Sequence, residues 1–314
     1  MAAPAQPLMH GITRLDTLQS RAGMAACYAI VRNSEVAFIE AGTSPGVPAL
    51  LDWLAQEGLS VAQVRYVMPT HVHLDHAGGV GLLMRACPQA RLVVHPRGAR
   101  HMIDPAALIA GATAVYGPER VKTAYGEIAP VPADRVDIGE DGSLWPLGDS
   151  TLEIIDAPGH ARHHFCVYDA TSGGLFTGDV FGLSYREFDT AKGPFLMPTT
   201  TPVQFEPDAW CHTLDRLLAK QPERAFLTHF GVVEGLPALA DTLRQGISDY
   251  LQLARAAPDG DGRHEAIRNS IAALTHRQLR AHGVTLGDDQ IEAILGLDID
   301  LNAQGLGVWL EKTG

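Results

Sequence analysis

Three histidines and an aspartate fall within one six-residue stretch of the chain, His71-Val72-His73-Leu74-Asp75-His76. Neutral imidazoles and carboxylates are good ligands for zinc, iron and manganese. The stretch directly follows an apolar run, Val64–Met68, and two glycines that allow close backbone approach come after it. A loop that leaves a buried strand can point alternate side chains at one centre, so the stretch predicts a metal site.

Further ligands follow three later strand-like runs in the same way. They are His160 after residues 151–157, Asp179 after residues 175–177, and His229 after residues 224–228. Seven ligands exceed the capacity of one tetrahedral ion and suit two ions that share a carboxylate. The sequence therefore predicts two divalent transition-metal ions, with zinc favoured and iron or manganese as alternatives. The ligand set is His71, His73, Asp75, His76, His160, Asp179 and His229.

The ligands need strand ends to hold them, and the first half of the chain alternates between strand and helix patterns. Two β-prone runs, 25–32 and 35–41, flank an Asn33-Ser34 turn, which predicts a hairpin. Helical apolar spacing follows over residues 47–58 and 80–86, and a strand is expected at 91–95. Residues 96–136 are helical and interrupted by prolines, so we expect an insertion there.

Strand patterns return in the second half and then give way to helices. We expect strands at 151–157, 164–169, 175–177 and 224–228, with a helix around 210–218. Beyond Gly235 the pattern is wholly helical, and Gly283 and Gly296 stand where helices are expected to end. We therefore predict a catalytic domain over residues 1–235 and a C-terminal helical extension, 236–314, docked on it.

Composition and charge narrow the class of protein. The 314 residues are 46% hydrophobic and 19% charged, which is typical of a globular protein. The net charge of −12, without a basic stripe, disfavours nucleic acid as a partner. Neither a membrane span nor a secretory signal is evident, so a cytoplasmic protein without membrane association is expected. The four cysteines are scattered, which predicts buried apolar roles rather than disulfides or a thiolate site.

The stretch 71–76 matches the H-x-H-x-D-H hallmark at every specified position, and the chain resembles the metallo-β-lactamase fold superfamily. The later elements of that family also occur in order, as Pro158-Gly159-His160, Gly178-Asp179 and His229. The resemblance implies an α/β fold, an αββα sandwich with a C-terminal helical extension. It also implies that His71, His73 and His160 hold one metal, that Asp75, His76 and His229 hold the other, and that Asp179 bridges them.

Within the superfamily, the segment 158–164 is most similar to the glyoxalase II-like and lactonase-like branch, although His163 stands where that branch usually has glycine. Glu40 replaces the usual aspartate, and it is either an acceptor for a ligand imidazole or a partly exposed carboxylate at a strand end. His163 and His164 flank a ligand and are candidates to line or orient the site. Tyr185 is a candidate hydrogen-bond donor to an oxyanion or leaving group.

Hydrolysis is the chemistry expected from two such ions, because a bridging hydroxide becomes available near neutral pH. We expect a small-molecule substrate with an ester, thioester or lactone bond, while β-lactams and phosphodiesters stay open. Either Asp75 or a metal-bound water is expected to return the proton. Two alternatives are a mononuclear iron sulfur dioxygenase of the same fold and a non-catalytic metal-binding protein. A homodimer is left open.

Overall fold

The chain forms two compact units. The computed structural model describes residues 4–200 and 202–313. The first unit comprises residues 1–156, 163–178 and 222–232, and the second comprises residues 157–162, 179–221 and 233–314. Both β-sheets belong to the first unit, apart from the last residues of one edge strand, whereas the long C-terminal helices belong to the second.

The first sheet has seven strands in the order of the sequence. Its first four strands are antiparallel and the last four run parallel, so that β4 takes part in both arrangements. The predicted hairpin is confirmed, with Asn33 and Ser34 forming its turn at positive φ. The strands are β1 (Ala5–Pro7), β2 (Ile12–Asp16), β3 (Ala26–Arg32), β4 (Glu35–Ile39), β5 (Val64–Met68), β6 (Arg91–Val94) and β7 (Val136–Ile138).

The second sheet has six strands in the order β13-β12-β11-β10-β9-β8. Strands β8 to β11 are antiparallel neighbours, and β12 runs parallel to β11. Its members are β8 (Leu144–Leu147), β9 (Ser150–Asp156), β10 (Phe165–Asp169), β11 (Gly174–Gly178), β12 (Arg224–Leu227) and β13 (Gly231–Glu234).

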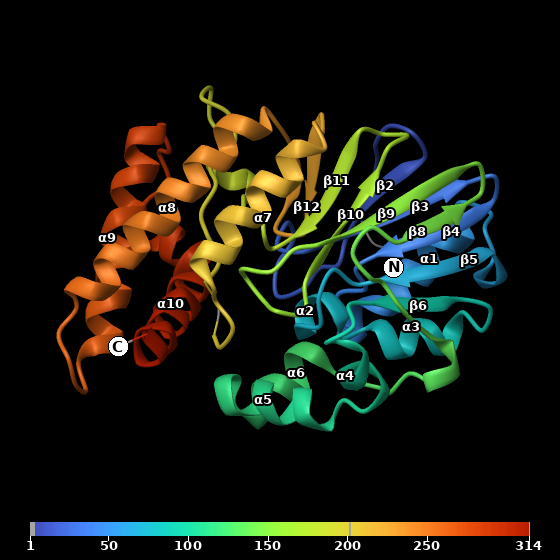
Figure 1. Ribbon diagram of the computed structural model, residues 1–314, viewed down its shortest axis with the longest axis horizontal. Coiled ribbons are helices and arrows are strands. Elements are labelled where there is room, and N and C mark those ends of the chain that lie inside the picture. The colour runs from blue at the N-terminus through green and yellow to red at the C-terminus, as the bar shows by residue number, and fades with distance from the viewer. Residues whose placement is uncertain (1–3, 201, 314) are drawn as a thin grey trace. The chain divides into compact units, whose positions relative to one another are not determined.

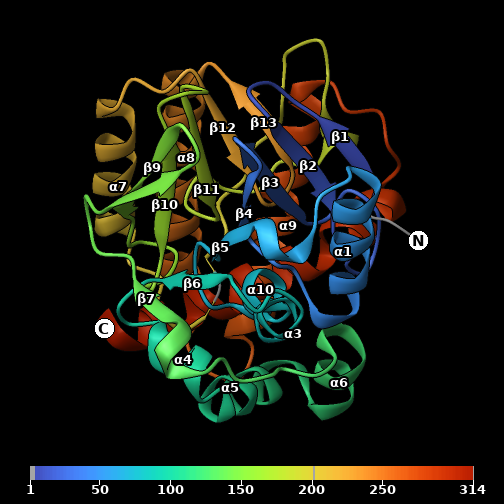
Figure 2. The same cartoon turned by 90° about the vertical axis from the view of Figure 1, so that its right-hand side faces the viewer.

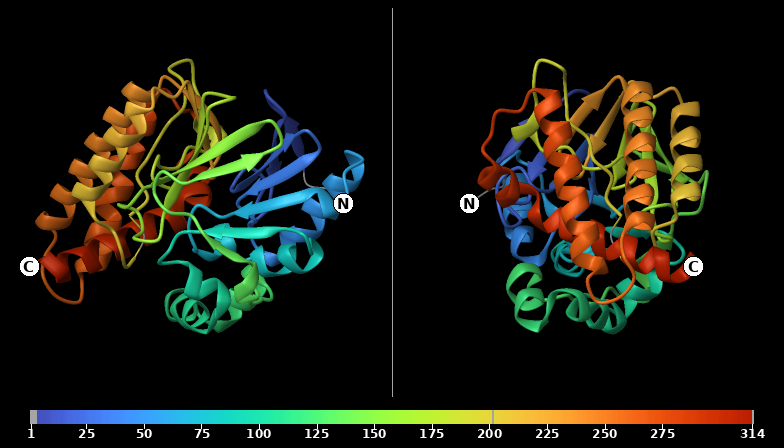
Figure 3. Two further views of the ribbon diagram at one scale, coloured as in Figure 1. Left: turned by 45° about the vertical axis from the view of Figure 1, so that its right-hand side comes forward. Right: turned by 90° about the vertical axis from the view of Figure 1, so that its left-hand side faces the viewer.

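The two sheets pack face to face in the first unit (Figure 3). Tyr28 of β3 lies between them, with its ring centroid 5.4 Å from that of Phe176 and 5.5 Å from that of Phe226. The Tyr28 hydroxyl donates a hydrogen bond to the Leu227 carbonyl oxygen at 2.7 Å. The aromatic core thus fixes the second sheet against the first close to the end of β12.

Helices cover the other face of the first sheet (Figure 2). Trp53 of α1 meets Phe38 of β4 edge to face at 6.1 Å, and Leu83 of α3 belongs to the same buried cluster. The predicted insertion is helical, and it supplies α4 to α6. The helices of this unit are α1 (Val47–Gln56), α2 (Leu74–Ala77), α3 (Val80–Ala86), α4 (Ala99–Ile103), α5 (Ala106–Tyr116) and α6 (Pro118–Tyr125).

The second unit contains α7 (Pro207–Ala219), α8 (Leu236–Ala256), α9 (Arg263–His282) and α10 (Asp288–Thr313). Helices α8, α9 and α10 lie side by side (Figures 1 and 3), and Leu243, Ile247, Ile267 and Ile271 are buried. The predicted C-terminus of α9 is confirmed, because Gly283 follows the helix in the left-handed conformation at φ 100°.

The prediction that a helix ends at Gly296 is wrong, because this residue lies inside α10. A glycine within a helix costs only about 1 kcal/mol relative to alanine. Burial of Leu295, Ile299 and Leu306 on one face of α10 outweighs that cost, since apolar burial contributes roughly 1.5–3 kcal/mol for each large side chain.

The α/β fold class with two sheets and C-terminal helices is confirmed. The domain boundary at residue 235 and the docking of the extension stay predictions. Within the described residues, no helix combines the length and the apolar character needed to cross a membrane.

One buried ion pair joins the two sheets and gives a test of how they are held together. The Arg32 guanidinium lies 2.9 Å from the Asp169 carboxylate, and these side chains are 7% and 0% exposed. Asp169→Asn leaves the arginine buried without its counter-charge, so we expect it to lower the free energy of unfolding by about 3–5 kcal/mol.

Urea denaturation measures this change, and Glu127→Gln is the matched control. Glu127 pairs with Arg85 on the surface, where the loss of an ion pair costs less than about 1 kcal/mol. A loss of stability for Asp169→Asn no larger than that of the control would show that the buried pair does not hold the sheets.

Candidate metal centre

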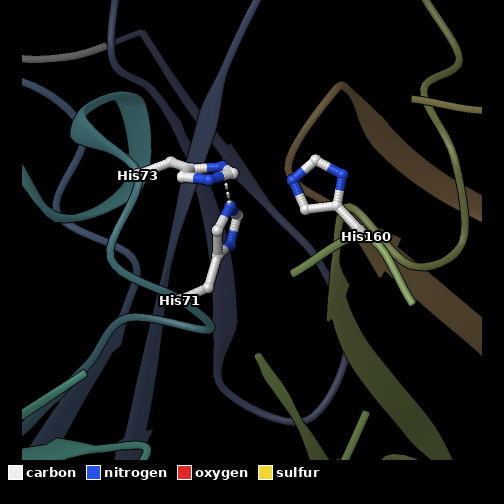
Figure 4. Close-up of side chains that lie close together, drawn as sticks. All are labelled: His71, His73 and His160. Carbon is white, nitrogen blue, oxygen red and sulfur yellow. Dashed lines mark hydrogen bonds between the residues drawn. The ribbon is translucent and has the colours of Figure 1, made fainter. Parts of the chain in front are cut away.

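The hallmark stretch begins in the turn after β5 and continues into the short helix α2. His71 and His76 are buried, whereas His73 and Asp75 are partly exposed. The His71 Nε2 and His73 Nδ1 atoms are 2.8 Å apart, as the dashed line in Figure 4 marks. The His71 and His76 rings lie 4.0 Å apart between centroids. The end of one buried strand thus gathers the predicted ligands of the hallmark.

His229 joins this cluster from the end of β12. Its Nε2 atom lies 3.2 Å from Asp75 Oδ2, and the Nε2 atom of His76 lies 3.5 Å from the same oxygen. One ligand atom from each of Asp75, His76 and His229 lies within 4.8 Å of the others. The first unit therefore brings together the three residues predicted to hold one of the two metals.

The buried carboxylate of Glu40 lies behind these ligands, just after β4. Its Oε1 atom accepts hydrogen bonds from the Thr70 hydroxyl at 2.6 Å, the Thr228 hydroxyl at 3.0 Å and His76 Nδ1 at 3.0 Å. Its Oε2 atom accepts a bond from the Thr70 backbone N–H at 3.1 Å. The hypothesis that Glu40 accepts a hydrogen bond from the imidazole of a predicted ligand is confirmed, and the alternative of a partly exposed carboxylate is wrong.

These hydrogen bonds determine which nitrogen of two imidazoles carries the proton. A carboxylate only accepts, so His76 Nδ1 is the protonated atom and Nε2 keeps a lone pair. The Thr70 hydroxyl donates its single proton to Glu40. Its oxygen therefore accepts a hydrogen bond from His71 Nδ1 at 3.1 Å. Glu40 thus sets the tautomer of His76 directly and that of His71 through Thr70.

Backbone carbonyl oxygens fix the tautomers of His229 and His160. His229 Nδ1 donates to the Met24 carbonyl oxygen at 2.7 Å, and His160 Nδ1 donates to the Thr199 carbonyl oxygen at 2.8 Å. In each ring Nε2 is left as the atom with a free lone pair. Four predicted ligands, His71, His76, His160 and His229, thereby share the tautomer that binds a metal through Nε2.

The cluster in the first unit suits a divalent cation. Two imidazole lone pairs and a carboxylate oxygen point at one another across 3.2–3.5 Å, and such an arrangement needs positive charge between the atoms. Burial raises the pKa of the Asp75 carboxyl, whereas His76 and His229, when both imidazoles are protonated, hold it well below its usual range through their charge and hydrogen bonds. Nitrogen and oxygen donors of this kind suit zinc, iron or manganese.

The second unit holds the other two predicted ligands, His160 and Asp179. His160, which Figure 4 also labels, has its Nε2 atom 3.4 Å from Asp179 Oδ2. Gly159 precedes His160 at φ 139°, and a Cβ there would lie 2.4 Å from the Cβ of Trp210. Only glycine fits this position, so the loop that presents His160 depends on it.

His163 and His164 belong to the first unit and stack on His71. The ring centroid of His164 is 4.8 Å from that of His71, and the centroid of His163 is 6.0 Å away. His163 also meets His73 edge to face at 5.3 Å. Both rings therefore pack against predicted ligands and restrict their orientation.

Tyr185 is buried in the second unit. Its hydroxyl donates a hydrogen bond to Asp298 Oδ2 of α10 at 3.2 Å. To serve as an oxyanion donor, Tyr185 would have to exchange this bond for one to the substrate. That catalytic role stays a prediction.

Thr70 and Thr228 were missed as functional residues by the sequence reasoning. Each directly precedes a predicted ligand, in Thr70-His71 and in Thr228-His229, at the end of a strand. Both hydroxyls reach the same oxygen of Glu40. The repeated Thr-His pair at two strand ends was the signal that could have revealed them.

The cysteines do not contribute to this cluster. Cys27, Cys87 and Cys166 are buried, and Cys211 is half-buried. Burial raises the pKa of the Cys27 thiol well above its usual value and that of Cys87 to about 11. Both thiols stay protonated at neutral pH, which makes them poor metal ligands.

Comparison with known protein families gives one match over most of the chain. A family model for the metallo-beta-lactamase superfamily matches residues 20–229. A metallo-beta-lactamase fold-containing protein of Sulfurisphaera tokodaii is 27% identical over 177 residues, which are 54% of this chain and 61% of that protein. An acyl-coenzyme A thioesterase of Gallus gallus is 27% identical over 192 residues, which are 56% of this chain and 64% of the relative.

A hydroxyacylglutathione hydrolase of Aeromonas hydrophila is 30% identical over 118 residues, or 38% of this chain and 34% of that enzyme. The chain thus spans less than two thirds of the length of each of these relatives.

Two solved structures share the fold over most of their length. An archaeal metallo-beta-lactamase superfamily protein of Sulfolobus tokodaii has a TM-score of 0.64 at 23% identity, covering 91% of this chain and 93% of the other. A metallo-beta-lactamase family protein of Thermus thermophilus has a TM-score of 0.65 at 20% identity, covering 92% of this chain and 88% of the other.

The role of Glu40 can be tested through metal affinity. Glu40→Gln places an amide N–H against groups that themselves donate, so the tautomers of His71 and His76 are no longer fixed. We expect the affinity for zinc to fall by about 10- to 100-fold. Competition with a chromogenic chelator measures this affinity.

Glu35→Gln is the matched control, because Glu35 begins the strand that ends just before Glu40 and accepts a hydrogen bond from the Gly148 N–H on the surface. Circular dichroism checks that both variants are folded. Equal zinc affinity of a folded Glu40→Gln variant and the wild type would refute the positioning role of Glu40.

Proposed function

Because the chain belongs to the metallo-beta-lactamase superfamily, we propose that it is a dinuclear metal-dependent hydrolase that cleaves an ester, thioester or lactone bond of a small molecule. The observation that carries the proposal is the cluster of Asp75, His76 and His229 behind which Glu40 fixes the imidazole tautomer. A cluster so arranged binds metal through three protein ligands and leaves room for a further ligand, as catalytic sites do.

The names of the relatives support a carbonyl substrate. One is a thioesterase and another a hydroxyacylglutathione hydrolase. Both names point to an acyl group attached to a leaving group, which a hydrolase releases by the addition of water. A thioester or ester of a small molecule is therefore the substrate class that we propose for this chain.

The seven ligands predicted from the sequence would hold two ions, most simply zinc. His71, His73 and His160 would bind one ion, Asp75, His76 and His229 the other, and Asp179 both. When bound, two such ions supply a Lewis acid and a water molecule with a pKa near 7. The mixed imidazole and carboxylate donor set fits that role without a thiolate.

The chain's own residues carry the remaining steps. The Asp75 carboxylate would accept a proton from the attacking water and return it to the leaving group. The Tyr185 hydroxyl would donate a hydrogen bond to the developing oxyanion. His163 and His164 hold the imidazole of His71 in place by packing against it.

A panel of esters, thioesters and lactones, assayed under anaerobic conditions, tests the proposed hydrolysis. Asp179→Asn weakens the ligand expected to hold both ions in register, while the sheets retain their own core. We expect turnover on the preferred substrate to fall by at least about 100-fold, with the free energy of unfolding changed by less than about 1 kcal/mol.

Asp241→Asn is the control for this variant, because Asp241 is an exposed carboxylate on α8 whose partner is Arg244. Wild-type turnover in Asp179→Asn would contradict its role as the bridging ligand. Activity that requires oxygen and one iron per chain would instead favour the sulfur dioxygenase alternative.

A further inference from the structure

The second unit contains a cavity of about 840 Å³. It is bounded by the segment before α7, the first turn of α7, the last turns of α8 and the C-terminal turns of α10. Its volume lies within the range of pockets that bind small molecules, roughly 300–1,000 Å³. Its apolar wall consists of Val203, Phe205, Leu251, Trp309 and Leu310.

The charged residues at this cavity are mostly engaged with one another or with the backbone. Arg162 Nε donates to Glu206 Oε1 at 2.8 Å, and Lys312 Nζ donates to the Val203 carbonyl oxygen. Asp208 lies in the first turn of α7, where the helix dipole favours a negative charge. Arg162, Glu206 and Lys312 therefore have hydrogen-bond partners, and the helix dipole stabilises the charge of Asp208.

Arg255 differs from them. Its guanidinium carbon lies 5.2 Å from the centroid of the Trp309 ring, over the ring face. Among the residues that the structure describes, no carboxylate lies within ion-pair distance of it. A guanidinium held over an aromatic ring keeps its N–H donors in its own plane, where they can bind a carboxylate with two parallel hydrogen bonds.

We propose that this cavity binds an amphipathic organic monoanion, a molecule with one carboxylate and an apolar body. The carboxylate pairs with Arg255, and the apolar body lies against Phe205, Trp309 and Leu251. Three basic and two acidic side chains line the cavity, so the lining carries one excess positive charge. That excess contrasts with the net charge of −12 of the chain, and it suits a single negative charge better than a polyanion.

The proposal goes beyond the proposed function, because binding in this cavity needs no metal. The cavity is nevertheless connected to the loop that carries His160. Arg162 ends that loop, and the Glu206 backbone N–H donates to the Gly159 carbonyl oxygen at 2.8 Å. A ligand that rests on Arg162 and Glu206 therefore contacts the segments that hold His160.

Isothermal titration calorimetry of the full chain with octanoate tests the proposal. We expect saturable binding of one octanoate per chain, with octan-1-ol binding at least about tenfold more weakly, because it lacks the charge that Arg255 recognises. Acetate, which has the charge without the apolar body, should give no saturable binding. Repeating the titration after chelation of metal should leave the octanoate affinity unchanged.

Variants of two arginines locate the site. Arg255→Gln should lower the octanoate affinity about tenfold, whereas Arg277→Gln, which removes the same charge from an exposed position on α9, should leave it unchanged. Trp309→Leu should lower it severalfold by removing the ring that supports the guanidinium.

Equal affinities of the Arg255 and Arg277 variants, or the absence of octanoate binding, would overturn the proposal. Binding that disappears on chelation would place the carboxylate on the metal instead. If octanoate binding persists in a protein that hydrolyses nothing, the proposed function fails and the cavity proposal stands.

Discussion

The carboxylate of Glu40 is the group around which the candidate metal centre of the first unit is organised. It is fully buried, and burial of a carboxylate is costly unless hydrogen bonds replace its lost hydration. Thr70 after β5, Thr228 after β12 and His76 in α2 supply those bonds. Removing any of these donors would leave the buried carboxylate with one hydrogen bond fewer, so this one group links the ends of both sheets.

This arrangement has a direct chemical consequence. An imidazole can bind a metal only through a nitrogen that carries no proton, and the acceptor on its other nitrogen selects which one that is. Glu40 and two backbone carbonyls make the selection for His71, His76, His160 and His229. The fold therefore fixes the tautomers of the predicted ligands in advance, which would lower the cost of ordering them on metal binding.

The sequence predicted most of this fold, because its strands are apolar and its ligands stand at strand ends. The bounds of β5 and α3 are confirmed to the residue, and the hairpin of β3 and β4 to within two residues. The strands β1, β2, β7, β8 and β13 were not predicted, because charged residues or proline interrupt or end their short apolar runs. The helix through Gly296 was missed because its stability comes from burial by neighbouring helices, which local propensity does not report.

The same limit applies to the metal centre. The sequence predicted the residue types of the ligands. It also allowed the prediction that Glu40 accepts a hydrogen bond from an imidazole. The carbonyl oxygens of Met24 and Thr199 could not be predicted as acceptors, because a backbone oxygen has no signature in a sequence. Each also lies far along the chain from its histidine. Contacts of this kind can be identified only from the three-dimensional structure.

The number of ions held by the purified protein tests the central claim most directly. Elemental analysis after loading with zinc and removal of excess metal should give close to two ions per chain. His229→Ala should retain close to one, while His264→Ala, on the exposed surface of α9, should retain two. One ion per chain at saturation in the wild type, with no further loss in His229→Ala, would contradict the dinuclear centre.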